Sequence, residues 1–256
     1  MDIKILSQDK DTVSFRITEV NHVFVNTMRR LITEEVPTLA IDELSIHRNS
    51  SALYDEMLAL RLGLIPLKTD LDSYVLPEKA KNELDPRAFL NLNLKIKGPI
   101  NVYASDLQSQ DTKIQPVYQK TLIVKLLKDQ EIELEAKAIL GKGKQHSKFI
   151  PGLAYYGYTQ KVNVKKKEPG EFKEKYPSTI FDKSGKIDPK LINTPELIDA
   201  CKNINNDIIE VTHENDSFDF SLESWGQLKP KEIFKEATKI FEEKLDSFEK
   251  EIKKID

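Results

Sequence analysis

The last part of the chain repeats a large apolar residue every seven positions, with charged residues between them. The residues on this line and beside it are Phe234, Phe241, Leu245, Phe248, Ile252 and Ile255. Such a period is typical of an amphipathic helix with one narrow apolar seam. Pro230 is tolerated in a first helical turn, so we expect a helix of about 26 residues, roughly 39 Å long. The seam packs either wholly on its own domain or in part against another polypeptide.

Apolar and polar residues alternate at the start of the chain, at 3–5 and 13–17, and predict two short strands. Asn21 is a good helix cap, and apolar residues then recur at helical spacing from Phe24 to Ile32. We expect Pro37 to end that helix, because a proline disfavours helical backbone before it.

The middle of the chain predicts mostly strands, with one short helix near 53–64. The strands are expected at 39–46, 90–96, 122–126, 132–136 and 155–164. Those at 122–126 and 132–136 are expected to pair with each other. From 168 to 206, prolines and a Pro-Gly turn break the chain into short pieces, as in a small inserted module. Alternation returns at 218–222, just before the terminal helix.

The first and last helices are both amphipathic, and each follows alternating strands. If they pack together, the two chain ends form one domain and the middle is inserted into it. The resulting expectation is an α+β protein with a discontinuous domain of 1–48 plus 216–256, an inserted mainly-β domain of 49–167 and a small third module of 168–215.

The composition narrows the function classes. Lys and Arg total 39 against 42 Asp and Glu, a net charge of −3, so any contact with nucleic acid requires a local basic patch. Cys201 is the only cysteine, which excludes an internal disulfide and a cysteine-based metal site. No apolar run reaches membrane-spanning length, so we expect a soluble, cytoplasmic protein.

No catalytic constellation is visible in the sequence. The four histidines are widely separated and lack the spacing of metal ligands, and no nucleophile elbow is present. Lys142, Lys144, His146 and Lys148 form either a local basic patch or a solvated loop. Arg29 and Arg30 point about 100° apart on the first helix, so they cannot both lie on its buried stripe. They are either interface residues or ordinary solvated arginines.

Four long motifs make the chain recognisable. Residues 26–44 resemble the first helix and following strand of the alpha-like subunits of RNA polymerase. Residues 49–67 resemble the next segment of the archaeal and eukaryotic members, residues 140–151 their glycine–lysine loop, and residues 218–233 the strand that leads into their terminal helix. The motifs occur in the family's order and cover both ends and most of the middle, and the length is most similar to the archaeal members.

The resemblance implies a dimerisation domain built from both chain ends, with a second domain inserted. It implies that the first and last helices pair with a smaller homologous subunit, named L in archaea. The residues that this resemblance places at the seam with L are Phe24, Met28, Leu31, Phe234, Phe241, Leu245, Phe248 and Ile252.

The resemblance also implies a surface for the large polymerase subunit, which is named B. The residues that match this surface are Arg29, Arg30, Tyr54, Lys142 and Lys144. In the family the alpha-like chain carries no catalytic residues and nucleates the enzyme, joining first L, then the small subunits N and P, and then B. The resemblance therefore implies that this chain contacts DNA only as part of the assembled enzyme.

The third module departs from the pattern of several archaeal relatives, whose ferredoxin-like module holds iron–sulfur clusters. Residues 176–186 are similar to the start of that module, where a cysteine often replaces Tyr176. A cluster normally needs four thiolates, and only Cys201 is present. We therefore expect a module without a metal, and no cofactor in this chain.

Two alternatives belong to other classes. A free-standing nucleic-acid-binding protein would use the lysine-rich stretches 142–148 and 161–167, and it would bind DNA in a strongly salt-dependent way. A stand-alone enzyme would need a catalytic constellation that the sequence does not show. If the chain is an assembly subunit, we expect neither DNA binding nor catalysis from the isolated chain. We expect instead that it self-associates when no partner covers its apolar seam.

Overall fold

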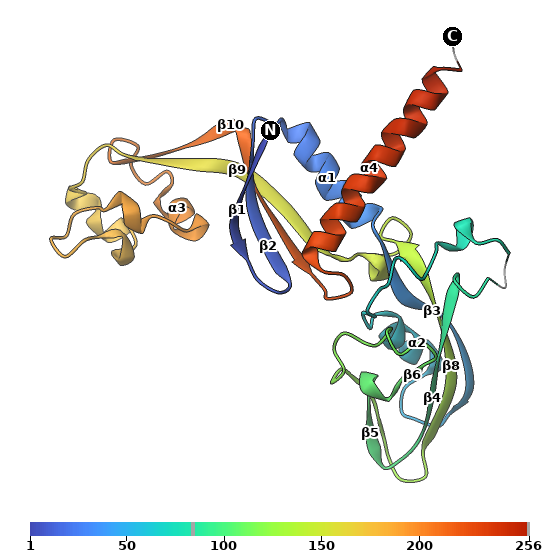
Figure 1. Ribbon diagram of the computed structural model, residues 1–256. Coiled ribbons are helices and arrows are strands. Elements are labelled where there is room, and N and C mark those ends of the chain that lie inside the picture. The colour runs from blue at the N-terminus through green and yellow to red at the C-terminus, as the bar shows by residue number, and fades with distance from the viewer. Residues whose placement is uncertain (83–84, 255–256) are drawn as a thin grey trace. The chain divides into compact units, whose positions relative to one another are not determined.

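The computed structural model describes residues 1–82 and 85–254 and has an α+β architecture of mostly antiparallel sheets with few helices (Figure 1). Ile255 of the predicted seam lies outside the described residues. The helices are α1 His22–Glu34, α2 Asp55–Gly63, α3 Pro195–Cys201 and α4 Pro230–Ile252. The strands are β1 Asp2–Gln8, β2 Thr12–Thr18, β3 Pro37–Asn49, β4 Phe89–Lys97, β5 Ile100–Tyr103, β6 Gln108–Ser109, β7 Leu122–Leu126, β8 Glu131–Lys142, β9 Gly152–Val164 and β10 Ile209–Ser224.

The chain packs into two compact units. The first comprises Met1–Leu6, Phe15–Val25 and Tyr156–Phe220, and the second comprises Ser7–Ser14, Asn26–Tyr155 and Ser221–Asp256. Helix α1 and strands β1, β2, β9 and β10 contribute residues to both units. The division into domains of 1–48 plus 216–256, 49–167 and 168–215 stays a prediction.

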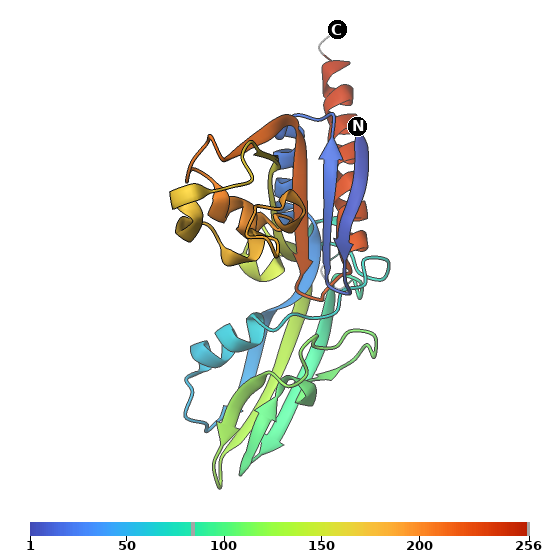
Figure 2. The same cartoon turned by 90° about the vertical axis from the view of Figure 1, so that its left-hand side faces the viewer.

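The second unit contains a four-stranded sheet in the order β3-β8-β4-β6. The alternation along strand β4 shows why this sheet forms. Leu90, Leu92 and Leu94 are buried, while the residues between them are partly or fully exposed. Helix α2 lies against the same core through Leu58 and Leu62, and Figure 2 shows it beside β3. The hydrophobic effect of these aliphatic side chains holds this part of the second unit together.

The predicted pairing of the strands at 122–126 and 132–136 is wrong. Strand β7 pairs with β5, whereas β8 lies between β3 and β4. The reason is that both edges of the 12-residue β8 are occupied: β3 and β4 pair with it in registers that extend from Pro37↔Lys142 and from Phe89↔Ile139, so no edge remains for β7. The five-residue β7 matches the short β5 instead.

Both helix starts follow the sequence signals. The Asn21 side chain accepts a hydrogen bond from the Phe24 N–H at 2.9 Å, as a helix cap does. Pro230 occupies the first position of α4, and the Glu232 side chain accepts from the Lys229 N–H at 2.9 Å. Helix α4 has 23 residues, about 35 Å at the usual rise.

The region of the predicted third module folds around a small apolar core in the first unit. Short 3-10 turns at Gly170–Lys175, Ser178–Ile180 and Pro189–Leu191, together with α3, surround it. Its buried members are Tyr176, Ile180, Ile187, Ile192, Cys201, Ile208 and Ile209. Strand β10 starts at Ile209, so residues 209–215 of the predicted module belong to a long strand that continues to Ser224.

Candidate partner-binding surface

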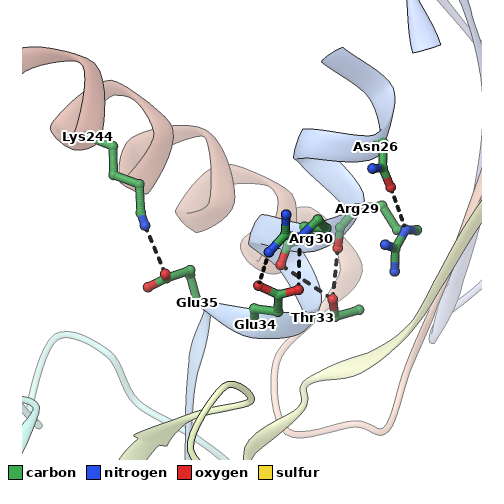
Figure 3. A network of polar contacts seen from close by, with 7 residues as sticks. All are labelled: Asn26, Arg29, Arg30, Thr33, Glu34, Glu35 and Lys244. Carbon is green, nitrogen blue, oxygen red and sulfur yellow. Dashed lines mark hydrogen bonds and ion pairs between the residues drawn. The ribbon is translucent and has the colours of Figure 1, made fainter. Parts of the chain in front are cut away.

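Arg29 and Arg30 project to different sides of α1 (Figure 3). Arg30 donates from Nε and Nη2 to the two carboxylate oxygens of Glu34, both at 3.0 Å, and these bonds hold the pKa of that carboxyl below its ordinary value. Arg29 is half-buried and donates from Nε to Asn26 Oδ1 at 3.1 Å. Within the part of the chain that is described, Arg29 forms no ion pair.

The loop after β8 is fixed to the end of α1. The Lys144 N–H donates to the Glu34 carbonyl oxygen at 3.0 Å, and Lys142 Nζ lies 3.2 Å from Glu35 Oε2. Gly143 makes this approach possible, because a Cβ at that position would lie 1.9 Å from the Thr33 carbonyl oxygen. The fold thereby gathers the predicted residues of α1 and of this loop into one charged cluster.

Glu35 joins this cluster to the terminal helix. Lys244 of α4 donates from Nζ to Glu35 Oε1 at 2.8 Å (Figure 3), while Lys142 contacts the other oxygen. Partial burial by itself would raise the pKa of the Glu35 carboxyl. The hydrogen bonds from the two lysines outweigh that effect and leave the pKa below its ordinary value. Glu35 therefore acts as a charged brace between the end of α1, β8 and α4.

We expect the brace to make stability depend on pH. Because the folded-state pKa of Glu35 is depressed, its contribution is fully present above the unfolded value of about 4.3 and disappears as pH falls through the folded value. Glu35→Gln should lower the free energy of unfolding at pH 7 by about 1 kcal/mol and flatten its pH dependence between about 5 and 2. Urea unfolding across this range measures both effects, with Glu243→Gln, an exposed residue of α4, as the matched control.

The apolar seam divides into a covered part and an open part. Met28 and Leu31 are buried within the chain, and Phe24, Phe234 and Phe241 are partly covered. Farther along α4 the seam is open to solvent: Leu245 is 51% exposed, Phe248 65% and Ile252 45%. The assignment of all eight residues to an interface stays a prediction. The exposed apolar residues at the end of α4 are the ones that test it most directly.

Tyr54 is placed apart from the other residues predicted to face the large subunit. It precedes α2 and is 80% exposed, whereas Arg29, Arg30, Lys142 and Lys144 cluster at the end of α1. The outer face of α2, where Met57, Leu60 and Leu64 are all about half exposed, was not among the predicted surfaces. Their spacing, beside the buried Leu58 and Leu62, gives the helix apolar residues on two sides, and this signal was readable in the sequence.

Four of the seven lysines in the two lysine-rich stretches, including Lys142, form ion pairs within the described part of the chain. Lys148 Nζ lies 2.6 Å from Asp42 Oδ1, Lys165 Nζ lies 3.1 Å from Glu210 Oε2, and Lys161 pairs with Glu214. Paired lysines contribute little to counterion release on DNA, so these contacts weigh against a free-standing nucleic-acid-binding protein.

The described residues contain no group of three or more His, Cys, Asp or Glu that is arranged to hold a metal ion. No helix in the described ranges is both long and apolar enough to cross a membrane.

Comparison with known proteins places the chain in a family. Residues 41–151 match the RNA polymerase Rpb3/RpoA insert domain. The chain is 36% identical to DNA-directed RNA polymerase subunit Rpo3 of Pyrococcus horikoshii, over 99% of this chain and 98% of that protein. The Rpo3 subunits of Thermococcus kodakarensis and Methanosphaera stadtmanae are 35% and 34% identical, over 100% and 96% of this chain and 99% and 97% of their own lengths. With this identity over nearly its whole length, the chain belongs to the Rpo3 family of archaeal DNA-directed RNA polymerase subunits.

Proposed function

We propose that this polymerase subunit is a non-catalytic assembly platform that pairs with the small alpha-like subunit, L, through α1 and α4. The observation that carries the proposal is the open end of the seam. Three large apolar residues in succession on one line of α4, Leu245, Phe248 and Ile252, are about half exposed or more. Such a stripe on a helix is typical of a surface that another polypeptide covers. The polymerase as a whole is a nucleotidyltransferase, and we propose that other subunits carry the residues that catalyse nucleotidyl transfer.

Co-expression with the small alpha-like subunit of the same genome tests this pairing. Size-exclusion chromatography with light scattering should show a one-to-one heterodimer, while the chain alone should self-associate through its open seam. A monodisperse monomer that ignores the small subunit would refute the proposal.

The charged cluster at the end of α1 is proposed as the docking surface for the large subunit. Its support is the half-buried guanidinium of Arg29, which has a defined position and no carboxylate partner among the described residues. An arginine held in this way is suited to bidentate recognition of a carboxylate on another chain. Tyr54 and the segment after it are proposed to serve the same assembly, which also includes the small subunits N and P.

We further propose that the third module, a degenerate ferredoxin-like domain, holds no iron–sulfur cluster. Cys201 is fully buried, and burial raises the pKa of its thiol, which disfavours the thiolate that a cluster needs. Tyr176, where relatives often have a cysteine, is buried in the same apolar core and brings its hydroxyl to the Asn205 carbonyl oxygen. One thiol and a filled core do not fit a cluster.

An iron assay checks this expectation. Protein purified with and without oxygen should contain iron well below one atom per chain, and its unfolding curve should not move when a chelator is added. Cys201→Ala should cost about 1–2 kcal/mol through the loss of a buried side chain, in both preparations alike. Stoichiometric iron in the anaerobic preparation would contradict the proposal.

A further inference from the structure

Two hollows of about 520 Å³ each lie on either side of the end of α2, in the second compact unit. Leu64 and Lys148 line both of them, so these two side chains form the boundary between the hollows. Leu64 is 55% exposed, which makes it a ridge that a partner would have to cross. We call the two hollows with this ridge the α2 groove. It involves neither the seam of α4 nor the charged cluster of Arg29.

The outer face of α2 has an ordered arrangement of charge. At 100° per residue, Leu60, Leu64, Met57 and Arg61 lie about 40°, 80°, 100° and 140° around the helix from Glu56. Leu64 directly follows the helix and keeps a helical backbone conformation, so the count extends to it. The face therefore reads acid, apolar, apolar, apolar, base from one edge to the other.

The surroundings extend this polarity. The hollow on the acid side is also lined by Asp42 and Asp55, and the hollow on the base side by no acidic residue. Asp42 is paired with Lys148, and Asp55 accepts a hydrogen bond from Asn49. Glu56 and Arg61 have no ion-pair partner anywhere in residues 1–82 or 85–254. The acid side of the α2 groove therefore presents two carboxylates without an ion pair among the described residues, Asp55 and Glu56, and the base side presents the guanidinium of Arg61.

The base side of the groove also exposes apolar side chains, and its guanidinium is held in a defined position. Tyr118, Leu122 and Trp225 line it and are 54%, 41% and 39% exposed. Arg61 donates from Nη2 to the Leu122 carbonyl oxygen at 2.7 Å, which fixes its guanidinium beside β7. A cation held at the edge of exposed aromatic and aliphatic side chains is typical of a hot spot for another protein.

We infer that the α2 groove binds one segment of another polymerase polypeptide, with a basic residue at one end, aliphatic or aromatic side chains in the middle and an acidic residue at the other. The basic residue lies at Glu56, the apolar side chains cross Leu60 and Leu64, and the acidic residue lies at Arg61. The opposite charges fix the direction in which the segment crosses α2, because the reversed direction places like charges together. This inference rests on the proposed assembly role and assigns a partner chemistry to a surface distinct from the α4 seam.

The experiment uses the complete polymerase, assembled with a photo-crosslinking amino acid in place of Tyr118. Irradiation should attach one segment of another subunit, and that segment should contain an acidic residue next to apolar ones. Arg61→Glu and Leu64→Asp should each reduce retention of that subunit about tenfold or more. Both side chains are exposed, so the fold should be retained, and Lys128→Glu, in the turn after β7, is the matched charge-reversal control.

A charge exchange makes the test specific. Changing the acidic residue of the crosslinked segment to lysine should restore retention in the Arg61→Glu background and weaken it in the unchanged protein. The inference is overturned if no crosslink forms, if the crosslink joins two copies of this chain, if the segment lacks an acid or if Lys128→Glu has the same effect as Arg61→Glu. Pairing with the small alpha-like subunit should be unchanged in every variant. Loss of that pairing in the unmodified protein would instead refute the assembly role itself.

Discussion

Replacing both Phe241 and Phe248 with aspartate should abolish pairing with the small alpha-like subunit. Each aromatic at the centre of such an interface typically contributes about 2 kcal/mol or more, so the double change should weaken the heterodimer by a factor of about 10³. Placing two carboxylates in an apolar seam adds the cost of burying unpaired charge. Co-purification followed by size-exclusion chromatography measures the loss, and hydrogen exchange should show the insert with its normal protection.

Phe248→Asp alone separates binding from folding. Phe248 is 65% exposed, so its replacement should change the free energy of unfolding by no more than about 0.5 kcal/mol. Phe241 is partly covered by its own chain, so the double variant is expected to lose some stability as well. Lys250→Asp is the matched control, because residue 250 lies about 200° around the helix from residue 248. Normal co-elution of the double variant would remove α4 from the interface.

The sequence was sufficient to predict the helix starts of this fold, but it was insufficient to predict which strands pair with each other. The helix of Pro230 and the cap of Asn21 follow from rules about a few neighbouring residues, and both predictions are confirmed. The pairing of 122–126 with 132–136 was wrong because strand partners are chosen by long-range packing. Strand β8 takes β3 and β4 on its two edges, and nothing in its own sequence identifies them.

The candidate surfaces show the same division. The periodicity located the apolar line of α4, but only tertiary contacts determine that Met28 is buried while Phe248 is open. Arg29 and Arg30 were correctly placed on different sides of one helix, since that follows from helical geometry alone. The brace joins Glu35 to Lys244, which are 209 positions apart in the chain, so no pattern of neighbouring residues predicts this contact.

Gly143→Ala should dismantle the charged cluster while leaving the seam intact. The new Cβ would lie 1.9 Å from the Thr33 carbonyl oxygen and 2.9 Å from Ile150 Cγ1. A backbone oxygen cannot turn aside as a flexible side chain can, so the loop must move away from α1. Overpacking of this kind typically costs about 1–3 kcal/mol, and the bond from the Lys144 N–H to the Glu34 oxygen should be lost with it. Urea unfolding of the heterodimer measures the loss of stability.

The functional consequence of Gly143→Ala distinguishes the two proposed surfaces. With the loop displaced, Lys142 and Lys144 no longer lie beside Glu34 and Glu35, so docking of the large subunit should weaken about tenfold or more. Pairing with the small alpha-like subunit should persist, because Phe248 and its neighbours on α4 are untouched. Gly157→Ala is the control, since a Cβ there meets no atom within 4 Å. If Gly143→Ala instead leaves large-subunit docking unchanged, the cluster at the end of α1 is structural, and recognition of that subunit lies elsewhere on the chain.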